Sequence, residues 1–179
     1  MKKWLFILSI ISLNAFSQEK TDSLFTGFKV EYFSNSNPRK KIEYRSGKPS
    51  GLTITYHPSG AINEVGVFVH GRWVGNYKLY FPSGRIQQNF NFDATGKRVG
   101  IQKYYYSNGL IQVISEYYNG KANGFTLTFD TLGKVASSIL LMDGKKVSEE
   151  EELYTKYKEM LDAMVELVNR ENETIIKAR

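Results

Sequence analysis

Glycine recurs at fixed intervals from Gly47 to Gly144, and this spacing constrains the fold more than any other feature of the sequence. Gaps of 4, 9 and 11 residues repeat in that order, with one gap of 12 between Gly84 and Gly96. The repeating units begin at Gly47, Gly71, Gly96 and Gly120. Of the 15 glycines, 13 follow this pattern, which identifies them as structural markers of a repeat array.

Each unit has the pattern of a β-hairpin. The first strands are expected after Gly51, Gly75, Gly100 and Gly124, and the hairpin turns end at Gly60, Gly84, Gly109 and Gly133. Two turns contain Pro-Ser-Gly, in which proline fixes φ at the second position and glycine accepts a positive φ at the end. We therefore expect three-residue loops with a glycine bulge. The extra residue in the gap of 12 predicts a longer loop over Asp93-Ala94-Thr95, or a bulge.

Large side chains occupy recurring positions in these hairpins. Five residues after the second glycine of each unit stand Tyr56, Tyr80, Tyr105 and Phe129, and two residues after the third glycine stand Ile62, Ile86, Ile111 and Val135. Because strand residues alternate between faces, equivalent positions are expected to stack as ladders on one face of a sheet. A single hairpin is marginally stable in water, so the neighbouring units must supply the missing contacts.

The N-terminal residues have the features of a signal peptide followed by an irregular repeat. Met1-Lys2-Lys3 is basic, residues 4–13 are apolar, and Ala15-Phe16-Ser17 offers small residues where signal peptidase cleaves. We predict a signal peptide over residues 1–17 and an exported protein, periplasmic or secreted; an uncleaved anchor is the alternative. Residues 18–46 then form a degenerate repeat, in which Gly27 lies 24 residues before Gly51.

The hairpin region resembles a known repeat family. The segments 105–109 (Tyr-Tyr-Ser-Asn-Gly) and 118–124 (Tyr-Asn-Gly-Lys-Ala-Asn-Gly) are similar to the variant MORN repeats of the YwqK-type antitoxin proteins. The resemblance covers residues 47–144 well and 24–46 weakly, and Leu52 and Thr55 depart from it where family members often have aromatics. It implies an extended sheet of consecutive hairpins. We therefore predict a mainly β fold: an elongated single antiparallel sheet of MORN-like hairpin repeats over residues 47–147, with a C-terminal α-helix.

Residues 148–179 have the pattern of an amphipathic helix and tail. Ser148 followed by Glu149 to Glu152 predicts a capped helix start. Apolar residues then follow at spacings of 4 and 3: Leu153, Tyr157, Met160, Met164 and Leu167. We expect the helix to pack against the last hairpin, where an open sheet end needs covering; self-association through the helix is the alternative. From Asn169 onward the chain is more polar and is expected to be held less firmly.

The sequence lacks patterns typical of catalysis, cofactor binding or metal binding. It contains no cysteine, and its two histidines, His57 and His70, lack metal-ligand spacing. Neither a nucleophile elbow nor a phosphate-binding loop occurs. A net charge of +6, with Arg39-Lys40-Lys41 as its densest basic cluster, does not indicate nucleic-acid binding. We therefore predict a protein that is not an enzyme and uses no cofactor.

Aromatic and basic residues of the middle units form the remaining candidate site. The candidate binding residues are Trp73, Tyr77, Lys78, Phe81, Lys103, Tyr104, Tyr106 and Tyr117. Consecutive strand residues point to opposite faces, so Tyr104-Tyr105-Tyr106 must place rings on both. The rings either form the packing of the sheet itself or make a strip that grips a partner, because tyrosine and tryptophan supply large contact areas at low entropic cost.

These features favour an exported, non-catalytic repeat protein that acts as a protein-interaction module or scaffold in the bacterial envelope. A protein is the expected partner. One alternative is an antitoxin or immunity protein that binds a toxin, as the family name implies. Another is an envelope protein that binds or modifies glycans, with tyrosines as sugar platforms. Contact with a membrane surface is weakly indicated, because the net charge is small.

Overall fold

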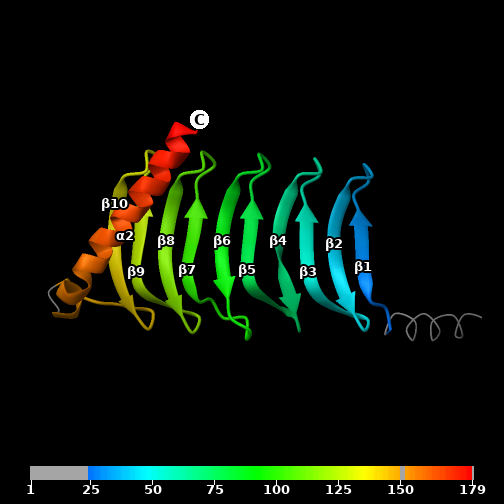
Figure 1. Ribbon diagram of the computed structural model, residues 1–179, viewed down its shortest axis with the longest axis horizontal. Coiled ribbons are helices and arrows are strands. Elements are labelled where there is room, and N and C mark those ends of the chain that lie inside the picture. Colours follow the sequence, from blue (N-terminus) through cyan, green and yellow to red (C-terminus); the bar gives the residue numbers. More distant parts are fainter. Residues whose placement is uncertain (1–23, 150–151, 179) are drawn as a thin grey trace, which may run out of the picture.

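The fold is one open antiparallel sheet of 11 strands in which every strand pairs with its neighbours in the sequence (Figure 1). The computed structural model describes residues 24–149 and 152–178, so the predicted signal peptide lies outside the described residues. The strands are β1 (Gly27–Tyr32), β2 (Pro38–Arg45), β3 (Lys48–Tyr56), β4 (Ile62–Val69), β5 (Arg72–Tyr80), β6 (Ile86–Phe92), β7 (Gly100–Tyr105), β8 (Ile111–Tyr118), β9 (Lys121–Phe129), β10 (Val135–Met142) and β11 (Lys145–Lys146). A C-terminal helix, α2 (Glu152–Lys177), completes the predicted mainly β fold, which is confirmed.

Two kinds of turn alternate along the sheet and lie at its two long margins. Tight two-residue turns with positive φ at both positions occupy one margin: Ser46-Gly47, His70-Gly71, Asn119-Gly120 and Asp143-Gly144. Longer loops occupy the other margin, as predicted. In one of them Phe81 N–H donates to Arg85 O at 2.8 Å and Gly84 N–H donates to Phe81 O at 2.8 Å. Gly84 has a φ of 81°, which glycine adopts without steric cost.

The degenerate first unit forms the same longer loop without glycine. Phe33 N–H donates to Asn37 O at 2.8 Å, and Ser36 N–H donates to Phe33 O at 3.0 Å. Ser36 takes the glycine position with a φ of 65°. The repeat geometry therefore extends to β1 and β2, although the sequence pattern is weak there.

The gap of 12 replaces a tight turn with a loop of the longer kind. Asp93 N–H donates to Lys97 O at 2.9 Å, and the Asp93 carboxylate accepts from Thr95 and Lys97 N–H at 2.8 and 3.0 Å. Between the Asn89–Lys103 pair and the Phe92–Arg98 bridge, the first strand advances by three residues and the second by five. The extra residue therefore produces both of the predicted features, a longer loop and a bulge.

A buried amide bridges this irregular junction between β6 and β7. Only two residue pairs, Gln88–Tyr104 and Asn89–Lys103, form the regular ladder between these strands. The Gln102 side chain is fully buried beside the bulge. Its Nε2 donates to Val99 O at 2.8 Å and to Asn91 O at 3.2 Å, and its Oε1 accepts from Asn91 N–H at 3.2 Å. One side chain thus supplies the hydrogen bonds that the interrupted ladder lacks.

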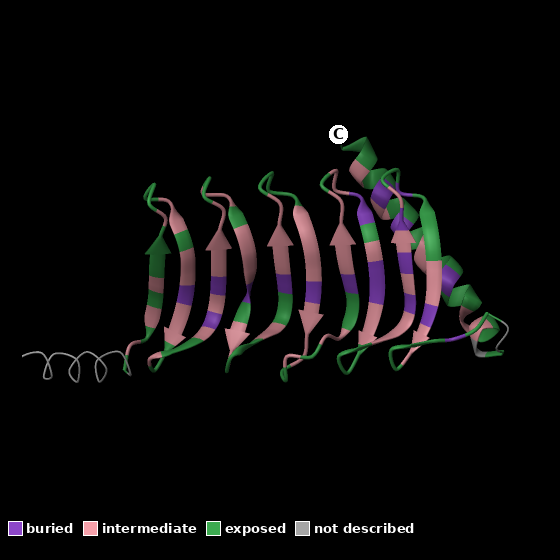
Figure 2. Cartoon of the chain, turned by 180° about the vertical axis from the view of Figure 1, so that it is seen from behind, coloured by how far each residue is buried: buried purple, intermediate pink, exposed green. Residues whose placement is uncertain are grey.

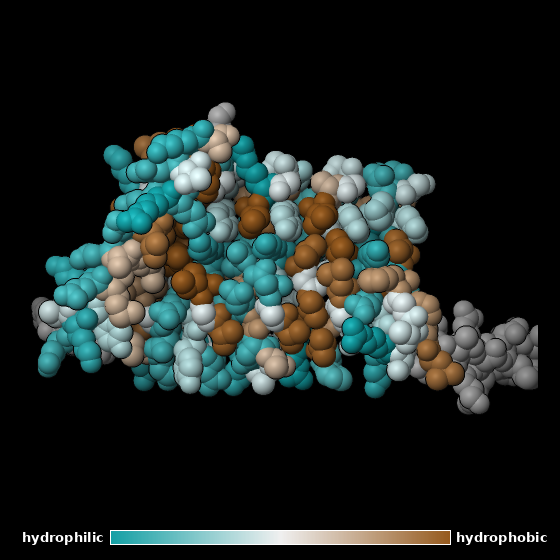
Figure 3. Space-filling model, in the orientation of Figure 1, coloured by the Kyte–Doolittle hydropathy of each residue, from teal (hydrophilic) through white to brown (hydrophobic). Residues whose placement is uncertain are grey.

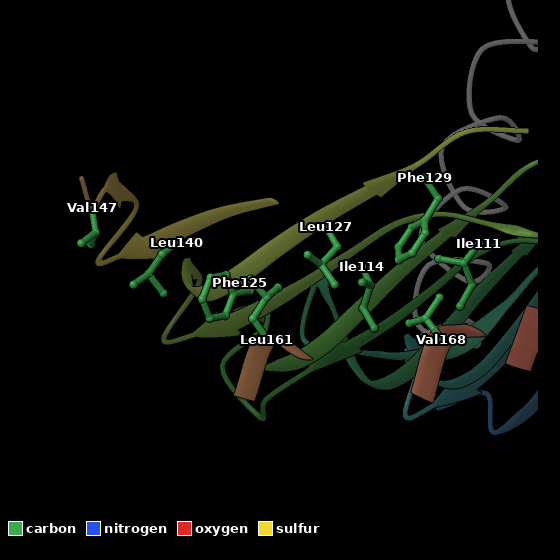
Figure 4. Packing of buried hydrophobic residues seen from close by; sticks show 9 residues of the cluster. All are labelled: Ile111, Ile114, Phe125, Leu127, Phe129, Leu140, Val147, Leu161 and Val168. Atoms are coloured by element: carbon green, nitrogen blue, oxygen red, sulfur yellow. The ribbon is translucent and has the colours of Figure 1, made fainter. Parts of the chain in front are cut away.

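Helix α2 crosses one face of the C-terminal strands obliquely and forms the main core with them (Figure 1, Figure 4). Buried residues lie mostly near the middle of the strands (Figure 2). The core residues are Ile111, Ile114, Phe125, Leu127, Phe129, Leu140, Val147, Leu161 and Val168. The prediction that the helix packs against the last hairpin holds, but α2 covers a face rather than the open edge and also reaches the preceding hairpin.

The described part of the helix begins at Glu152, and residues 150–151 lie outside the described residues, so the capped start at Ser148 stays a prediction. The chain is still attached to the sheet at Val147, whose N–H donates to Leu140 O at 2.9 Å. The expectation that the chain is held less firmly from Asn169 onward does not hold at Asn172, although most of the polar residues there are exposed. Asn172 is buried, accepts from Ile111 N–H at 3.2 Å and donates to Gly133 O at 3.5 Å.

Side chains tie each longer loop to the next along their margin. Asn35 and Asn37 donate to Pro58 O, Arg85 donates to Ser107 O, and Asn108 donates to Thr131 O. The His57 ring shares a hydrogen bond with Tyr80 O at 3.0 Å, which links the remaining neighbours. All five loops on this margin are therefore connected in a row.

Candidate binding surfaces

The eight predicted binding residues fall in three separate places. Four of them lie on the face opposite α2: Trp73, Tyr77, Tyr104 and Tyr117. The rings of Trp73 and Tyr77 contact each other, Tyr104 contacts Phe90, and Tyr117 lies against Arg98. Lys78 and Lys103 lie on the α2 face, where Lys103 pairs with Glu171 of the helix. Phe81 and Tyr106 begin two of the longer loops, and Tyr106 Oη donates to Phe129 O at 2.8 Å. The structure therefore does not bring the eight together into one strip.

On the face opposite α2, aromatic rings touch in a continuous row. The centroids of Phe68 and Trp73 are 5.1 Å apart, those of Trp73 and Tyr77 are 4.9 Å apart, and those of Phe90 and Tyr104 are 5.0 Å apart. The Tyr77 ring stacks on the Phe90 ring with 6.1 Å between their centroids, and this contact joins the first group of rings to the second. Tyr104 and Tyr105 point to opposite faces, as strand geometry predicts, because Tyr105 packs against the α2 core.

Two charged residues that were not among the predicted binding residues complete this row. The Arg98 guanidinium lies 4.3 Å from the Phe90 ring centroid and 5.5 Å from that of Tyr117, and Nη1 donates to Tyr104 Oη at 3.3 Å. Tyr77 Oη donates to Glu64 Oε1 at 2.6 Å. Arg98 stands two residues after the first glycine of its unit, where the preceding unit has Trp73, and this shared place is the sequence signal that could have identified it.

Burial shows what the aromatic row does for the fold. Tyr77 is 8% exposed and Phe90 is 4% exposed, although within residues 24–149 and 152–178 no element is stacked on this face. The rings bury one another, and this burial raises the pKa of Tyr77, with a further contribution from the Glu64 hydrogen bond. Trp73, Tyr104 and Tyr117 remain half-exposed. The row is therefore a second small core with a partly accessible surface.

The α2 face is covered over its C-terminal strands and open over β3–β6. The open part carries the same aromatic–aliphatic pairs that lie under the helix, since Tyr56 faces Ile62 and Tyr80 faces Ile86 just as Tyr105 faces Ile111. We call this surface the open half-face; its apolar residues are Leu52, Ile54, Tyr56, Ile62, Val65, Val67, Tyr80 and Ile86. Figure 3 shows hydrophobic side chains gathered on this side beyond the edge of the helix.

A cleft separates α2 from the open half-face. Its volume is about 500 Å³, and it lies between the C-terminal end of the helix and the loops at Gly84 and Gly109. Its walls include Ile86 and Tyr105 from the sheet and Glu171 and Ile175 from the helix. Burial raises the pKa of the Tyr105 hydroxyl, with Glu171 adding to the effect.

Within residues 24–149 and 152–178, no three His, Cys, Asp or Glu side chains are grouped so as to hold a metal ion. No helix there has the length and apolar character needed to cross a membrane.

Comparison with known proteins gave no sequence match and only weak similarity to solved structures. No family model matches the sequence, and no curated protein matches it. A crystal structure of a S. aureus TarM mutant in complex with fondaparinux, α-GlcNAc-glycerol and UDP is similar over 66% of this chain and 24% of that chain, with 12% identity and a TM-score of 0.36. A second TarM crystal structure gives the same coverage, 11% identity and a TM-score of 0.35. Scores this low carry no argument about function.

Proposed function

We propose that this chain is a non-catalytic protein-interaction module, exported to the bacterial envelope, that binds a partner protein on the open half-face. The observation that carries the proposal is the unequal cover of one sheet face. α2 buries the apolar ladder over the C-terminal strands, whereas Ile62 and Val67 remain 41% and 38% exposed. Exposed apolar side chains gathered on one face and bordered by polar residues are typical of interaction sites.

The chemistry of the open half-face also suits a protein partner. Tyrosine, isoleucine and valine provide contact area, and Lys78 adds one charge. Asn76, Asn89 and Asn91 lie beside Lys78 on the same face and hydrogen bond to one another, so the surface also offers polar groups to a partner. Rigid strands hold these side chains, so little ordering entropy is lost when a partner binds. The basic and apolar N-terminus supports export, and the resemblance to MORN-type repeats supports a binding role.

Site-specific photo-crosslinking tests the proposed function. A photoreactive phenylalanine analogue at Val67, in the open half-face, should give a discrete crosslinked product in the native envelope. The matched control is the same analogue at Ser137, which is exposed on β10 and hydrogen bonds Thr128 at 2.7 Å. Excess unlabelled protein should compete with the crosslink, and a Val67→Asp competitor should not. Equal products from both positions, or none from Val67, would contradict the proposal.

A further inference from the structure

Helix α2 shows which chemistry the ladder face accepts. Its Glu171 pairs with Lys103 Nζ, its Asn172 binds the backbone of Ile111, and its Leu161 and Val168 are buried against the strands. Tyr105 packs beside these contacts. An amphipathic helix with one acidic residue therefore fits a sheet unit that presents lysine, tyrosine and isoleucine.

The preceding unit presents the same three side chains in the same places. Lys78 stands three residues after the second glycine of this unit, and Tyr80 stands five residues after it. Ile86 stands two residues after the third glycine. Lys103, Tyr105 and Ile111 hold these positions in the covered unit. The residue pairing repeats as well, because Tyr80 faces Ile86 as Tyr105 faces Ile111. The unit that begins at Gly47 has Ile54 at the lysine position. The unit with Lys78 is therefore the one regular unit that presents this lysine on a part of the sheet not covered by α2.

Among the residues that the structure describes, Lys78 lacks the acidic partner that Lys103 has. Within residues 24–149 and 152–178, the ion pair of Lys103 with Glu171 has no counterpart at Lys78, whose side chain is half-buried. Ile86 of the same unit forms one wall of the 500 Å³ cleft, and Glu171 and Ile175 of α2 form the opposite wall. A second helix placed over Lys78 would fill this cleft along the side of α2.

The spacing of the two units matches the spacing of packed helices. β5, which carries Lys78, and β7, which carries Lys103, are two strands apart, or about 9.6 Å. The axes of packed helices lie about 8–10 Å apart. Two helices on adjacent units would therefore contact the sheet and each other at once.

We propose that the open half-face binds an amphipathic helix of a partner protein beside α2, with an acidic side chain paired to Lys78 and apolar side chains on Tyr80 and Ile86. The inference rests on the proposed function and specifies the class of its partner. A second copy of this chain is a poorer occupant. Its own α2 already has Leu161 and Val168 buried, and ion pairs Arg170–Glu166 and Lys177–Glu173 lie on its exposed side.

A helix with the sequence of α2 is a defined probe for this site. We would add a fluorescent peptide of residues 152–178, stapled between the exposed positions 166 and 170, to the full chain and follow its anisotropy. The peptide should bind saturably. Lys78→Glu should weaken binding by about tenfold or more, because a partly desolvated attraction becomes a repulsion. A peptide with Glu171→Lys should regain affinity for the Lys78→Glu protein. The control, Lys145→Glu, makes the same charge change in the exposed strand β11 and should leave binding unchanged.

Each other outcome counts against the inference. If the peptide does not bind saturably, the inference that the partner is a helix is wrong. If the Val67 crosslink still forms in that case, the proposed function as a protein-interaction module is retained. Binding insensitive to Lys78→Glu would place the peptide elsewhere, for instance in exchange with α2. Concentration-dependent dimerisation of the unmodified chain that Lys78→Glu abolishes would assign the surface to a second copy. Circular dichroism and melting temperature of each variant establish that it is folded.

Discussion

At the scale of single residues, the repeat imposes its backbone even where the sequence does not favour it. Ser36 holds a φ of 65° in the first loop, a conformation that the other longer loops give to glycine. For a residue with a side chain, the left-handed region costs roughly 1 kcal/mol. The neighbouring hydrogen bonds of Phe33 and Asn37 must offset this cost.

Replacing Ser36 with glycine should therefore stabilise the protein. We expect the free energy of unfolding to rise by about 0.5–1 kcal/mol, since relief of strain exceeds the added entropy of the unfolded chain. Urea unfolding measures the change. The reverse substitution, Gly84→Ser, is the matched control, because it places serine at a φ of 81° with open space around a Cβ, and it should destabilise. A Ser36→Gly variant with lower stability would contradict the strain argument.

The Tyr77 hydroxyl gives stability a dependence on alkaline pH. Burial, and then the hydrogen bond to Glu64, raise the pKa of Tyr77 above its unfolded value of about 10. A raised pKa in the folded state means that this contribution is complete below pH 10 and is lost as pH rises toward the folded pKa.

Tyr77→Phe should flatten the alkaline part of the stability profile. We expect the melting temperature of the unmodified protein to fall more steeply between pH 9 and pH 11 than that of the variant. Tyr105, whose pKa burial also raises, is present in both proteins and cancels from the comparison. Parallel profiles for the two proteins would show that the Tyr77 ring does not couple ionisation to folding.

At the scale of elements, the junction between β6 and β7 has the fewest regular residue pairs of any junction among strands β1 to β10. Two regular residue pairs join these strands, whereas six join β5 to β6 and six join β7 to β8. The Gln102 amide occupies the interruption and satisfies the backbone of Asn91 and Val99. Local opening is expected to begin here, where the fewest backbone bonds must break.

Gln102→Leu should destabilise the protein at this junction. Leucine fills similar space but leaves backbone groups of Asn91 and Val99 without their partner, at a cost of about 1–3 kcal/mol. Hydrogen exchange should accelerate in β6 and β7 before it changes in β9. Gln112→Leu, at an exposed position of β8, is the control and should have little effect. Unchanged exchange in β6 and β7 would show that the amide does not hold the junction closed.

Periodic features were predictable from the sequence, and features that depend on contacts between units were not. The glycine grid located the loops, and the recurring Tyr105 and Ile111 positions identified the ladder face. Asn172 could not be anticipated, because nothing along the helix marks a polar residue that meets Ile111 N–H, 61 positions away in the chain. The predicted binding residues fall in separate places for a similar reason. Residues adjacent in the sequence, such as Tyr77 and Lys78, lie on opposite faces of the sheet.

At the scale of the whole molecule, the sheet is built of units that contact their neighbours only. Ser46 and His70 precede equivalent glycines and have the same φ of 48°, so residues 47–70 form a complete unit that could be removed without altering a turn. Stability of such arrays is approximately a sum over units and their interfaces. The core under α2 is remote from this unit and should not depend on it.

A chain lacking residues 47–70 should fold, with its long dimension shorter by about 10 Å, the width of two strands. Small-angle scattering measures the length, and α-helical circular dichroism reports on α2. Tyr77 loses Glu64 in this variant, so a modest fall in melting temperature is expected. Loss of the helical signal would show that the units cooperate over a longer range than neighbour contacts allow.

The row of bonds that connects the longer loops has an interrupted counterpart on the opposite margin. Every pair of adjacent longer loops is tied by a side chain to a carbonyl, from Asn37 with Pro58 through to Asn108 with Thr131. On the tight-turn margin, Arg72 reaches Thr95 O, Lys97 reaches Asn119 and Gly144 N–H donates to Ala122 O, but within residues 24–149 and 152–178 no such bond joins the turn at 46–47 to the turn at 70–71. In-plane bending should therefore open the sheet first between these two turns.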